Sequence, residues 1–351
     1  MAKRMATDED DENLSLFDDD GFDEEEDGDK RRRGGARKPL LIIGALFLVL
    51  VLGGVAIAGW YLSRVNTALD DIERGPQLPT NYPGQPERAD DYEAQNIVLM
   101  GSDDRYDGGG GRSDSLIVLH LSGDGENAYL ISFPRDLWVP IPDHGTAKIN
   151  AAYAYGGPQL TVRTMEQLLE TRIDHTAEID FAGFIALTDT LGGVTVNNKV
   201  ESSWKEYHFP RGELTLKDGK EALVYVRQRK ELPNGDLDRA ERQRAVIKAI
   251  ISKAASPETL TNPGKFSSMV GDMSRHITVD DTLTSEQIRS LALDSKIRSG
   301  SQIKSLQAPI TGFDMSSDGQ SIAVVDEPAM AELAKALQED TMDEYLEKHP
   351  N

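Results

Sequence analysis

The sequence predicts an α/β fold, an α-β-α sandwich with a central mixed sheet, preceded by a single transmembrane helix. Short runs rich in Ile, Val and Leu, bounded by Gly and Asp, are typical of buried strands. Segments with apolar residues at helical spacing alternate with these runs, as they do in sandwiches of helices and sheet. One uncharged run near the N-terminus is long enough to cross a bilayer.

The composition of the 351-residue chain excludes several classes of protein. The absence of cysteine excludes disulfide frameworks, cysteine-ligated zinc or iron–sulfur sites and a thiol nucleophile. The formal net charge of −22 argues against a nucleic-acid binder, which needs a basic face. We therefore predict no nucleic-acid partner.

The first 38 residues combine an acidic stretch with a basic cluster. Residues 8–29 hold fourteen acidic side chains and no basic one, so this stretch repels itself and is predicted to be disordered. The basic residues of segment 30–38 stand directly before the uncharged run. The positive-inside rule therefore places residues 1–38 in the cytoplasm.

The uncharged run at 39–63 is predicted to be the transmembrane helix. Trp60 and Tyr61 lie at its far end, where aromatic rings prefer the membrane interface. A cleaved secretory signal is the alternative, but the apolar run is longer than a signal peptide requires and no clear cleavage site follows it. The chain is thus expected to be a single-pass protein of the cell membrane, with the part that follows the helix outside the cytoplasm.

The remainder is predicted to be a linker and one domain. Residues 64–94 are polar and contain four closely spaced prolines, which predicts an extracellular linker. Residues 95–351 form the domain. Strands are expected at Asn96–Met100, Ser115–Leu121, Asn127–Ser132, Val194–Val200, Gln302–Gln307 and Ser321–Val325, and helices at Pro158–Glu170, Asp180–Leu191, Asp218–Val226, Leu237–Ala255, Ser285–Ser295 and Pro328–Leu337.

Charged side chains fall on a helix face that should point inward. Stepping back by three and four residues from the apolar stripe around Ile250 leads to Arg239, Arg242 and Gln243. A charge in such a position needs a partner. Ordinary ion pairs with nearby acids are one interpretation, and an anionic ligand is the other.

Other cations favour the anionic ligand. Arg227 and Arg229 are two residues apart, so in an extended segment they point the same way, and Arg135 directly follows a strand. Loops after strands are where α/β sheets place ligands, and the planar arginine fork suits phosphate. Arg105, Arg112 and Lys148 occupy similar loop positions. The pattern is typical of a polyanion or pyrophosphate site.

Two aspartates flank the first two predicted strands. Asp103 follows the first strand and Asp114 precedes the second, so neighbouring strands would bring them to one sheet edge. Paired carboxylates beside arginines suit Mg²⁺, or Mn²⁺ in its place, bridging phosphate oxygens. Taken alone, two loop aspartates are commonly turn residues. The glycine run Gly108–Gly111 lacks the Gly-Lys-Ser/Thr of a phosphate loop, and His175 is predicted to be structural.

A set of short motifs in this sequence resembles the LytR-CpsA-Psr family of cell-envelope enzymes. The motifs cover residues 96–255 in the family's order, and the anchor with a short cytoplasmic tail matches the family layout. They are NIVLMGSDDR (Asn96–Arg105), GRSDS (Gly111–Ser115), SFPRD (Ser132–Asp136), KINAAYAYGG (Lys148–Gly157), IDH with DFAGF (Ile173–His175, Asp180–Phe184), LGGVTV (Leu191–Val196), YVRQR (Tyr225–Arg229) and GDLDRAERQ (Gly235–Gln243).

The resemblance implies an extracytoplasmic phosphotransferase that moves a glycopolymer from a polyprenyl-pyrophosphate carrier to a hydroxyl of peptidoglycan or a glycoprotein. It implies that Asp103 and Asp114 hold Mg²⁺ and act in catalysis with Arg227 and Arg229. It also implies a fold whose core holds the lipid tail, for which Phe181–Leu191 and Val246–Ile251 are candidate linings, although an ordinary core needs the same residues. The implied pyrophosphate-binding residues are Arg105, Arg112, Arg135, Lys148, Arg227, Arg229, Arg239, Arg242 and Gln243. Arg244 departs from the family, where many relatives carry glutamine.

Two other functions remain open on the sequence. One is a pyrophosphatase that transfers the phosphoryl group to water, and the other is a non-enzymatic envelope regulator or scaffold. Transfer to a labelled acceptor distinguishes the first from a transferase, and turnover that needs the arginines but not the acidic tail argues against the second.

Overall fold

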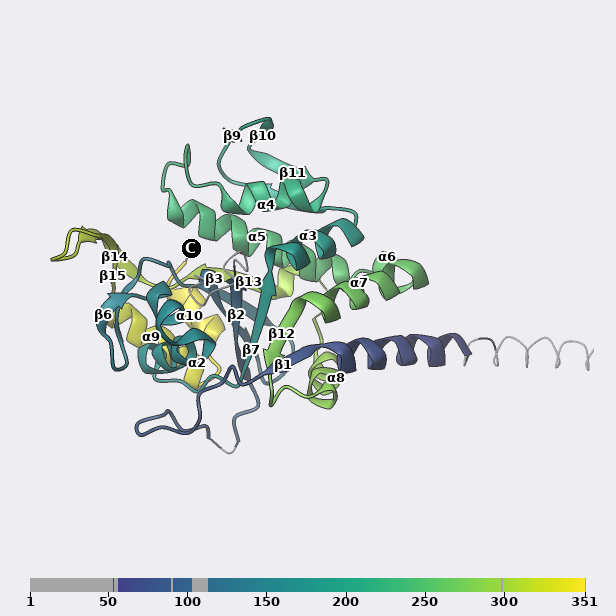
Figure 1. Cartoon of the computed structure of the whole chain (residues 1–351), viewed down its shortest axis with the longest axis horizontal. Coiled ribbons are helices and arrows are strands. Elements are labelled where there is room, and N and C mark those ends of the chain that lie inside the picture. The colour runs from purple at the N-terminus through teal and green to yellow at the C-terminus, as the bar shows by residue number, and fades with distance from the viewer. Residues whose placement is uncertain (1–52, 54–55, 90, 103–112, 298, 351) are drawn as a thin grey trace, which may run out of the picture. The chain divides into compact units, whose positions relative to one another are not determined.

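The computed structural model describes residues 53, 56–89, 91–102, 113–297 and 299–350 (Figure 1). The predicted acidic tail and most of the predicted membrane span lie outside these residues. Among the residues that are described, no helix is both long and apolar enough to cross a membrane. Residues 56–71 are helical, and Ile57–Asn351 form one compact unit.

A seven-stranded mixed sheet forms the centre of this unit. Three strand pairs are parallel, β1–β12, β7–β2 and β4–β13, and the other pairs are antiparallel. The predicted strands near residues 96, 115, 127 and 302 correspond to β2, β3, β4 and β13, which confirms the mixed central sheet. In spatial order the strands are β1 (Glu73–Gly75), β12 (Ile277–Asp280), β7 (His175–Asp180), β2 (Gln95–Ser102), β3 (Ser113–Leu121), β4 (Ala128–Ser132) and β13 (Ile303–Gln307).

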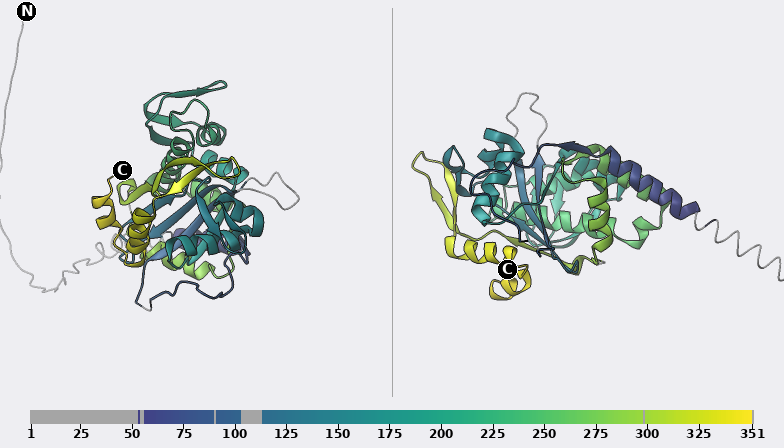
Figure 2. Two further views of the ribbon diagram at one scale, coloured as in Figure 1. Left: turned by 90° about the vertical axis from the view of Figure 1, so that its left-hand side faces the viewer. Right: turned by 90° about the horizontal axis from the view of Figure 1, so that it is seen from below.

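Helices pack on both faces of the sheet because successive strand residues point to opposite sides. On one face, Val98 and Val118 join a large apolar core with α2 (Asn150–Leu169), α9 (Glu327–Gln338) and α10 (Met342–Lys348). On the other face lie α3 (Phe181–Thr190), α5 (Asp236–Ala254) and α7 (Pro263–His276) (Figures 1 and 2). The two helical layers agree with the predicted sandwich.

A small cap of strands and one helix packs on α5, above the sheet in Figure 1. Its helix α4 (Gly219–Arg227) begins after Asp218, whose side chain accepts a hydrogen bond from the Glu221 amide. The helix predicted at Asp218–Val226 corresponds to α4, and the strand predicted at Val194–Val200 corresponds to β8, with ends that differ by at most two residues. The strands are β8 (Val194–Asn198), β9 (Ser202–Trp204), β10 (Tyr207–Phe209) and β11 (Gly212–Leu216).

Helix α2 begins eight residues earlier than the sequence predicts. It is kinked, because Gly156 and Gly157 have non-helical backbone angles, and Pro158 starts its second part. The prediction thus matches only the second part. The remaining elements are β5 (Trp138–Ile141), β6 (Gly145–Lys148), α6 (Pro257–Leu260), α8 (Ser285–Asp294), a 3₁₀ turn (Gly300–Gln302), β14 (Ile310–Met315) and β15 (Ser321–Val325).

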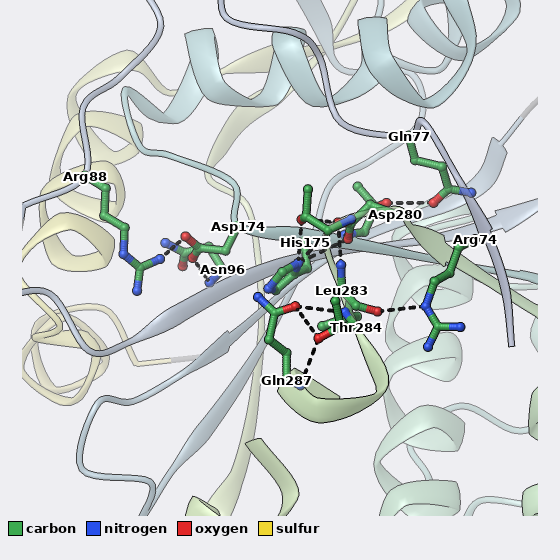
Figure 3. Close-up of polar contacts among 12 residues, drawn as sticks. Arg74, Gln77, Arg88, Asn96, Asp174, His175, Asp280, Leu283, Thr284 and Gln287 are labelled. Atoms are coloured by element: carbon green, nitrogen blue, oxygen red, sulfur yellow. Dashed lines mark hydrogen bonds and ion pairs between the residues drawn. The ribbon is translucent and has the colours of Figure 1, made fainter. Parts of the chain in front are cut away.

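Residues 64–94, for which the sequence predicts a linker, lie against the domain. After the helix ends at residue 71, β1 pairs with β12. Farther on, the Tyr82 hydroxyl donates to Glu166 Oε2 (2.8 Å), and Arg88 forms an ion pair with Asp174, which Figure 3 shows. The folded unit therefore extends to residues well before 95.

Candidate functional site

A cavity of about 520 Å³ lies between the sheet and the helices α3, α5 and α7. The strand register places Leu99 opposite Ile117 on one side and Ala177 on the other, so these three side chains share one face of the sheet. Helices α3 and α5 supply further apolar wall. The lining on these helices and the following segments includes Phe181, Phe184, Leu187, Leu223, Val226, Ile247, Ile250, Ile251, Met273 and Ile277.

Four arginines and a glutamine line the same cavity, and the sequence predicts all five as pyrophosphate-binding residues. They come from three places: Arg135 from the loop after β4, Arg227 and Arg229 from the end of α4, and Arg239 and Gln243 from the first half of α5. The rest of the lining is mainly apolar. The cavity is therefore amphipathic: its wall carries the guanidinium groups and the carboxylates of Glu178 and Asp180, and is otherwise mainly hydrocarbon.

Asp236, which the sequence analysis did not single out, connects three of these arginines. Its Oδ1 lies 2.8 Å from Arg239 Nη2, 3.2 Å from Arg229 Nε and 3.7 Å from Arg135 Nε. These contacts are ion pairs, because none of the described groups offers this oxygen a well-oriented hydrogen bond. Asp236 thus brings three guanidinium groups together at one point of the cavity wall, an arrangement of donors that suits an anionic ligand. The signal for Asp236 was its position three residues before Arg239 in one helical turn.

Arg227 is held beside the cavity by an aromatic ring. Its guanidinium carbon lies 4.5 Å from the centroid of Phe181, the first residue of α3. This cation–π contact limits the conformations of an otherwise exposed arginine. Asp180, also on the cavity wall, precedes Phe181 and caps α3 by accepting from the Gly183 amide. The sequence predicts Phe181 as part of a candidate lipid lining and Asp180 as the start of a helix, but it predicts no role beside Arg227 for either residue.

Lys148 does not line the cavity but is connected to it. Its Nζ lies 2.9 Å from Asp136 Oδ1, and Asp136 Oδ2 lies 3.9 Å from Arg135 Nε. Lys148 thus neutralises the acidic neighbour of Arg135.

Arg242 is predicted as a pyrophosphate-binding residue, but the structure places it away from the other arginines. It is buried against the cap, where its guanidinium donates to Gln228 Oε1 (2.8 Å), Ser202 Oγ (2.7 Å) and the Val200 carbonyl (2.9 Å). The ring of Tyr225 packs 4.3 Å from its guanidinium carbon. Burial lowers the pKa of Arg242 from its ordinary value. Arg242 therefore connects α5 to the cap by hydrogen bonds and does not line the cavity.

Replacing Arg242 by alanine should lower the free energy of unfolding by about 2–4 kcal/mol, because Gln228 and Ser202 would lose a charged partner while remaining buried. Urea unfolding measures this loss. Arg211→Ala, at an exposed position of the same cap, is the control and should change stability by less than about 0.5 kcal/mol. If the urea unfolding curves of the two variants had the same midpoint and the same slope, the structural role of Arg242 would be contradicted.

Two further residues from the sequence analysis have structural partners. Arg244, the departure from the family pattern, is buried and donates to Ser132 Oγ, and burial lowers its pKa to about 10.

His175 Nδ1 lies 3.2 Å from Asp280 Oδ2 in the network of Figure 3. Burial opposes ionisation of Asp280, but hydrogen bonds from His175 and Thr282 hold the pKa of this carboxyl below its ordinary value. The contact agrees with the prediction that His175 is structural.

The residues that precede the two predicted metal ligands are paired at one edge of the sheet. Asp103, Arg105, Arg112 and the glycine run lie outside the described residues, and Asp114 is described only as part of the β3 backbone. Ser102, the residue before Asp103, pairs with Ser113, the residue before Asp114, and also with Asp180 on β7. No cluster of three or more His, Asp or Glu side chains that could hold a metal occurs among the described residues. Metal binding by Asp103 and Asp114 therefore stays a prediction.

Both candidate lipid-lining segments contribute to the cavity wall, though not with every residue. Phe181, Phe184 and Leu187 line it from α3, and Ile247, Ile250 and Ile251 line it from α5. Val246 turns instead into the apolar cluster of the cap. Both segments thus line the same cavity.

Comparison with known proteins gives the same family along most of the chain. The LytR_cpsA_psr family matches residues 64–339. The polyisoprenyl-teichoic acid–peptidoglycan teichoic acid transferase TagU of Bacillus subtilis (strain 168) is 36% identical over 245 residues, which cover 70% of this chain and 77% of TagU. The B. subtilis TagV crystal structure has a TM-score of 0.61 and 29% identity, covering 72% of this chain and 98% of TagV. TagT bound to LIIa-WTA has a TM-score of 0.56 and 27% identity, covering 77% of this chain and 97% of TagT. The chain belongs to the LytR-CpsA-Psr family.

Proposed function

We propose that this chain is a membrane-anchored, extracytoplasmic phosphotransferase that moves a glycopolymer from a polyprenyl-pyrophosphate carrier to an acceptor hydroxyl in cell-wall assembly. The observation that carries the proposal is the amphipathic cavity. Its arginines offer paired donors to phosphate oxygens, and its apolar wall offers a dry surface to a hydrocarbon chain. A polyprenyl pyrophosphate has both of these parts in one molecule.

The relatives support both the donor and the acceptor of the proposed reaction. TagU is named for transfer of teichoic acid from a polyisoprenyl carrier to peptidoglycan, and TagT has been solved with LIIa-WTA. We therefore assign a lipid-linked glycopolymer as donor, and peptidoglycan as acceptor with a glycoprotein as the other possible acceptor. The uncharged run 39–63 and the basic residues before it support a single membrane span that leaves the domain outside the cytoplasm.

The proposed chemistry is a substitution at the phosphorus next to the glycan. The acceptor oxygen forms a bond to this phosphorus as the bond to the bridging pyrophosphate oxygen breaks. The products are a phosphodiester-linked polymer and polyprenyl monophosphate, and the hydroxyl proton leaves to a base, for which Asp103 is the candidate. Arg227, Arg229 and Arg239 stabilise the charge that develops on the leaving phosphate, because fixed donors cost no reorganisation during the reaction.

We also propose that Asp103 and Asp114 hold Mg²⁺, or Mn²⁺ in its place. The support is the backbone register, which brings the residues preceding them together at one sheet edge. Carboxylate oxygens are the preferred ligands of both ions. A bound divalent ion would supply further neutralisation of the pyrophosphate charge.

The test incubates the full-length chain in lipid nanodiscs with a polyprenyl-pyrophosphate glycan, a labelled peptidoglycan acceptor and Mg²⁺. We expect the label to appear in the polymer together with polyprenyl monophosphate. Asp114→Ala and removal of Mg²⁺ by chelation should each lower the rate by about 100-fold or more, because the substrate charge is then poorly neutralised. Glu213→Ala removes an exposed acid of the cap and is the matched control, for which the rate should not change.

Three outcomes would contradict parts of this proposal. Lipid monophosphate without labelled polymer would show transfer to water and therefore a pyrophosphatase. Retained activity of Asp114→Ala under chelation would exclude the metal site. Tight lipid binding without turnover of any acceptor would favour an envelope scaffold.

A further inference from the structure

The N-terminal helix (residues 57–71) is packed along the domain. Tyr61, Val65 and Ala68 recur at helical spacing on its inward side. Tyr61 and Val65 join an apolar cluster with Phe266 and Met269 of α7, and the Tyr61 and Phe266 rings are 5.0 Å apart. The aromatic contact places the first turns of α7 at the same level as residues 57–64.

The end of this helix is fixed to the domain by polar contacts. Arg74 donates from Nη2 to the Leu69 carbonyl (2.8 Å) and to Ser285 Oγ (3.0 Å), and from Nε to the Leu283 carbonyl (3.2 Å), the last of which Figure 3 shows. Ser285 in turn donates to Asp70 Oδ1 (2.8 Å). The helix, β1 and the start of α8 are thus held as one piece.

The outward side of the first helical turns is apolar and exposed. Ile57, Trp60 and Leu62 have 59%, 37% and 60% of their surface exposed. Leu260, at the end of α6 and shortly before α7, is 45% exposed. Burying such side chains away from water is favourable, and their exposure in an acidic, polar domain calls for a partner. Arg64 follows these residues, with its guanidinium carbon 5.6 Å from the Trp60 ring centroid.

We propose that these four residues, Ile57, Trp60, Leu62 and Leu260, form a membrane-contact surface that inserts into the outer leaflet of the bilayer. The chain before Ile57 supports a lipid partner, because residues 39–63 form one uncharged run that ends within this helix. Trp and Tyr followed by an arginine are the side chains that prefer the membrane interface. The surface therefore sets the height and orientation of the whole domain on the membrane.

This orientation gives the lipid tail of the proposed function a direct route to the cavity. Leu187, Ile250 and Met273 belong both to the cluster that contains Tyr61 and to the cavity wall. Apolar side chains thus continue from the membrane-contact surface to the cavity. A polyprenyl tail moving along them would avoid exposing hydrocarbon to water. The route rests on the proposed transfer reaction. The contact surface rests only on the proposed membrane span, to which Leu260 adds a residue from outside the run 39–63.

The contact surface is tested by spin labelling of the full-length chain in lipid vesicles. Because the chain has no cysteine, Leu260→Cys gives a single labelling site. Phe313→Cys, 54% exposed on β14 far from the helix in Figure 1, is the control. We expect the label at position 260 to be accessible to oxygen but protected from a water-soluble nickel complex, and the label at 313 to show the reverse. Equal access of the nickel complex to both labels would overturn the proposal.

The route is tested by Leu260→Glu, which places a charge in the contact surface without changing the cavity. Turnover of a long-chain substrate embedded in vesicles should fall about tenfold, because charges partition poorly into lipid. Turnover of a short-chain substrate dispersed in water should not change. Wild-type turnover of embedded substrate by Leu260→Glu would overturn the route. Failure of the unmodified protein to process either substrate would instead contradict the proposed function, and the spin labels would still decide the contact surface.

Discussion

Replacing Arg227 by alanine is expected to lower the rate of glycopolymer transfer by about 100- to 1,000-fold, the usual cost of removing one fixed donor to developing negative charge. Arg227 stands on the cavity wall, and its contact with Phe181 holds the guanidinium in place. Arg227→Lys should recover only part of the loss, because an ammonium group cannot donate two parallel hydrogen bonds to phosphate. Steady-state rates with a saturating lipid-linked donor measure the effect.

Lys230 offers the matched control for Arg227. It carries the same charge three residues later, is exposed, and does not line the cavity. Lys230→Ala should therefore keep the wild-type rate. If the two alanine variants lost activity equally, the general positive charge of the segment, and not contact with substrate, would explain the effect.

Replacing Ala177 by tryptophan is expected to block long lipid tails without disturbing the pyrophosphate end. Ala177 lies in the sheet wall of the cavity, beside Leu99 and opposite the helices. An indole at this position would occupy space that the lipid tail needs. If it excludes three CH₂ groups of the tail, each worth about 0.8 kcal/mol when buried, binding of a long-chain donor weakens by roughly 50-fold. The ratio of kcat/KM for a long-chain and a short-chain donor measures the change.

Ala177→Val is the control, because it adds only two methyl groups at the same position. It should shift the chain-length ratio far less than tryptophan does. A tryptophan variant that lowered kcat/KM equally for both donors would indicate distortion of the arginine end, and one with an unchanged ratio would show that the tail binds elsewhere.

The sequence was sufficient for the sheet and for most of the arginine group. Buried strands such as β2 and β3 are visible because each contains an uninterrupted apolar run, Ile97–Met100 in β2 and Leu116–Leu119 in β3. The stripe on α5 predicted that Arg239 and Gln243 point inward, which their place on the cavity wall agrees with. The same stripe included Arg242, which turns to the cap. The inward side of α5 meets both the sheet and the cap, and periodicity alone cannot separate these two partners.

Features that depend on distant segments could not be predicted. Asp236 contacts Arg135 and Arg229, which the fold brings from β4 and α4 to the start of α5. No pattern among neighbouring residues in the sequence indicates that these three segments come into contact. The packing of residues 64–94 was missed for a related reason, since prolines and polar residues are typical of a linker, whereas β1 depends on pairing with β12 about 200 residues later in the chain.

The most direct test of the account is photo-crosslinking of the full-length chain with a polyprenyl pyrophosphate that carries a diazirine in its tail. We expect labelled peptides from α3 and α5, which both line the cavity, and loss of labelling when unmodified polyprenyl pyrophosphate competes. Labelling that spares both helices, or that survives competition, would contradict the claim that one cavity holds both the pyrophosphate and its lipid.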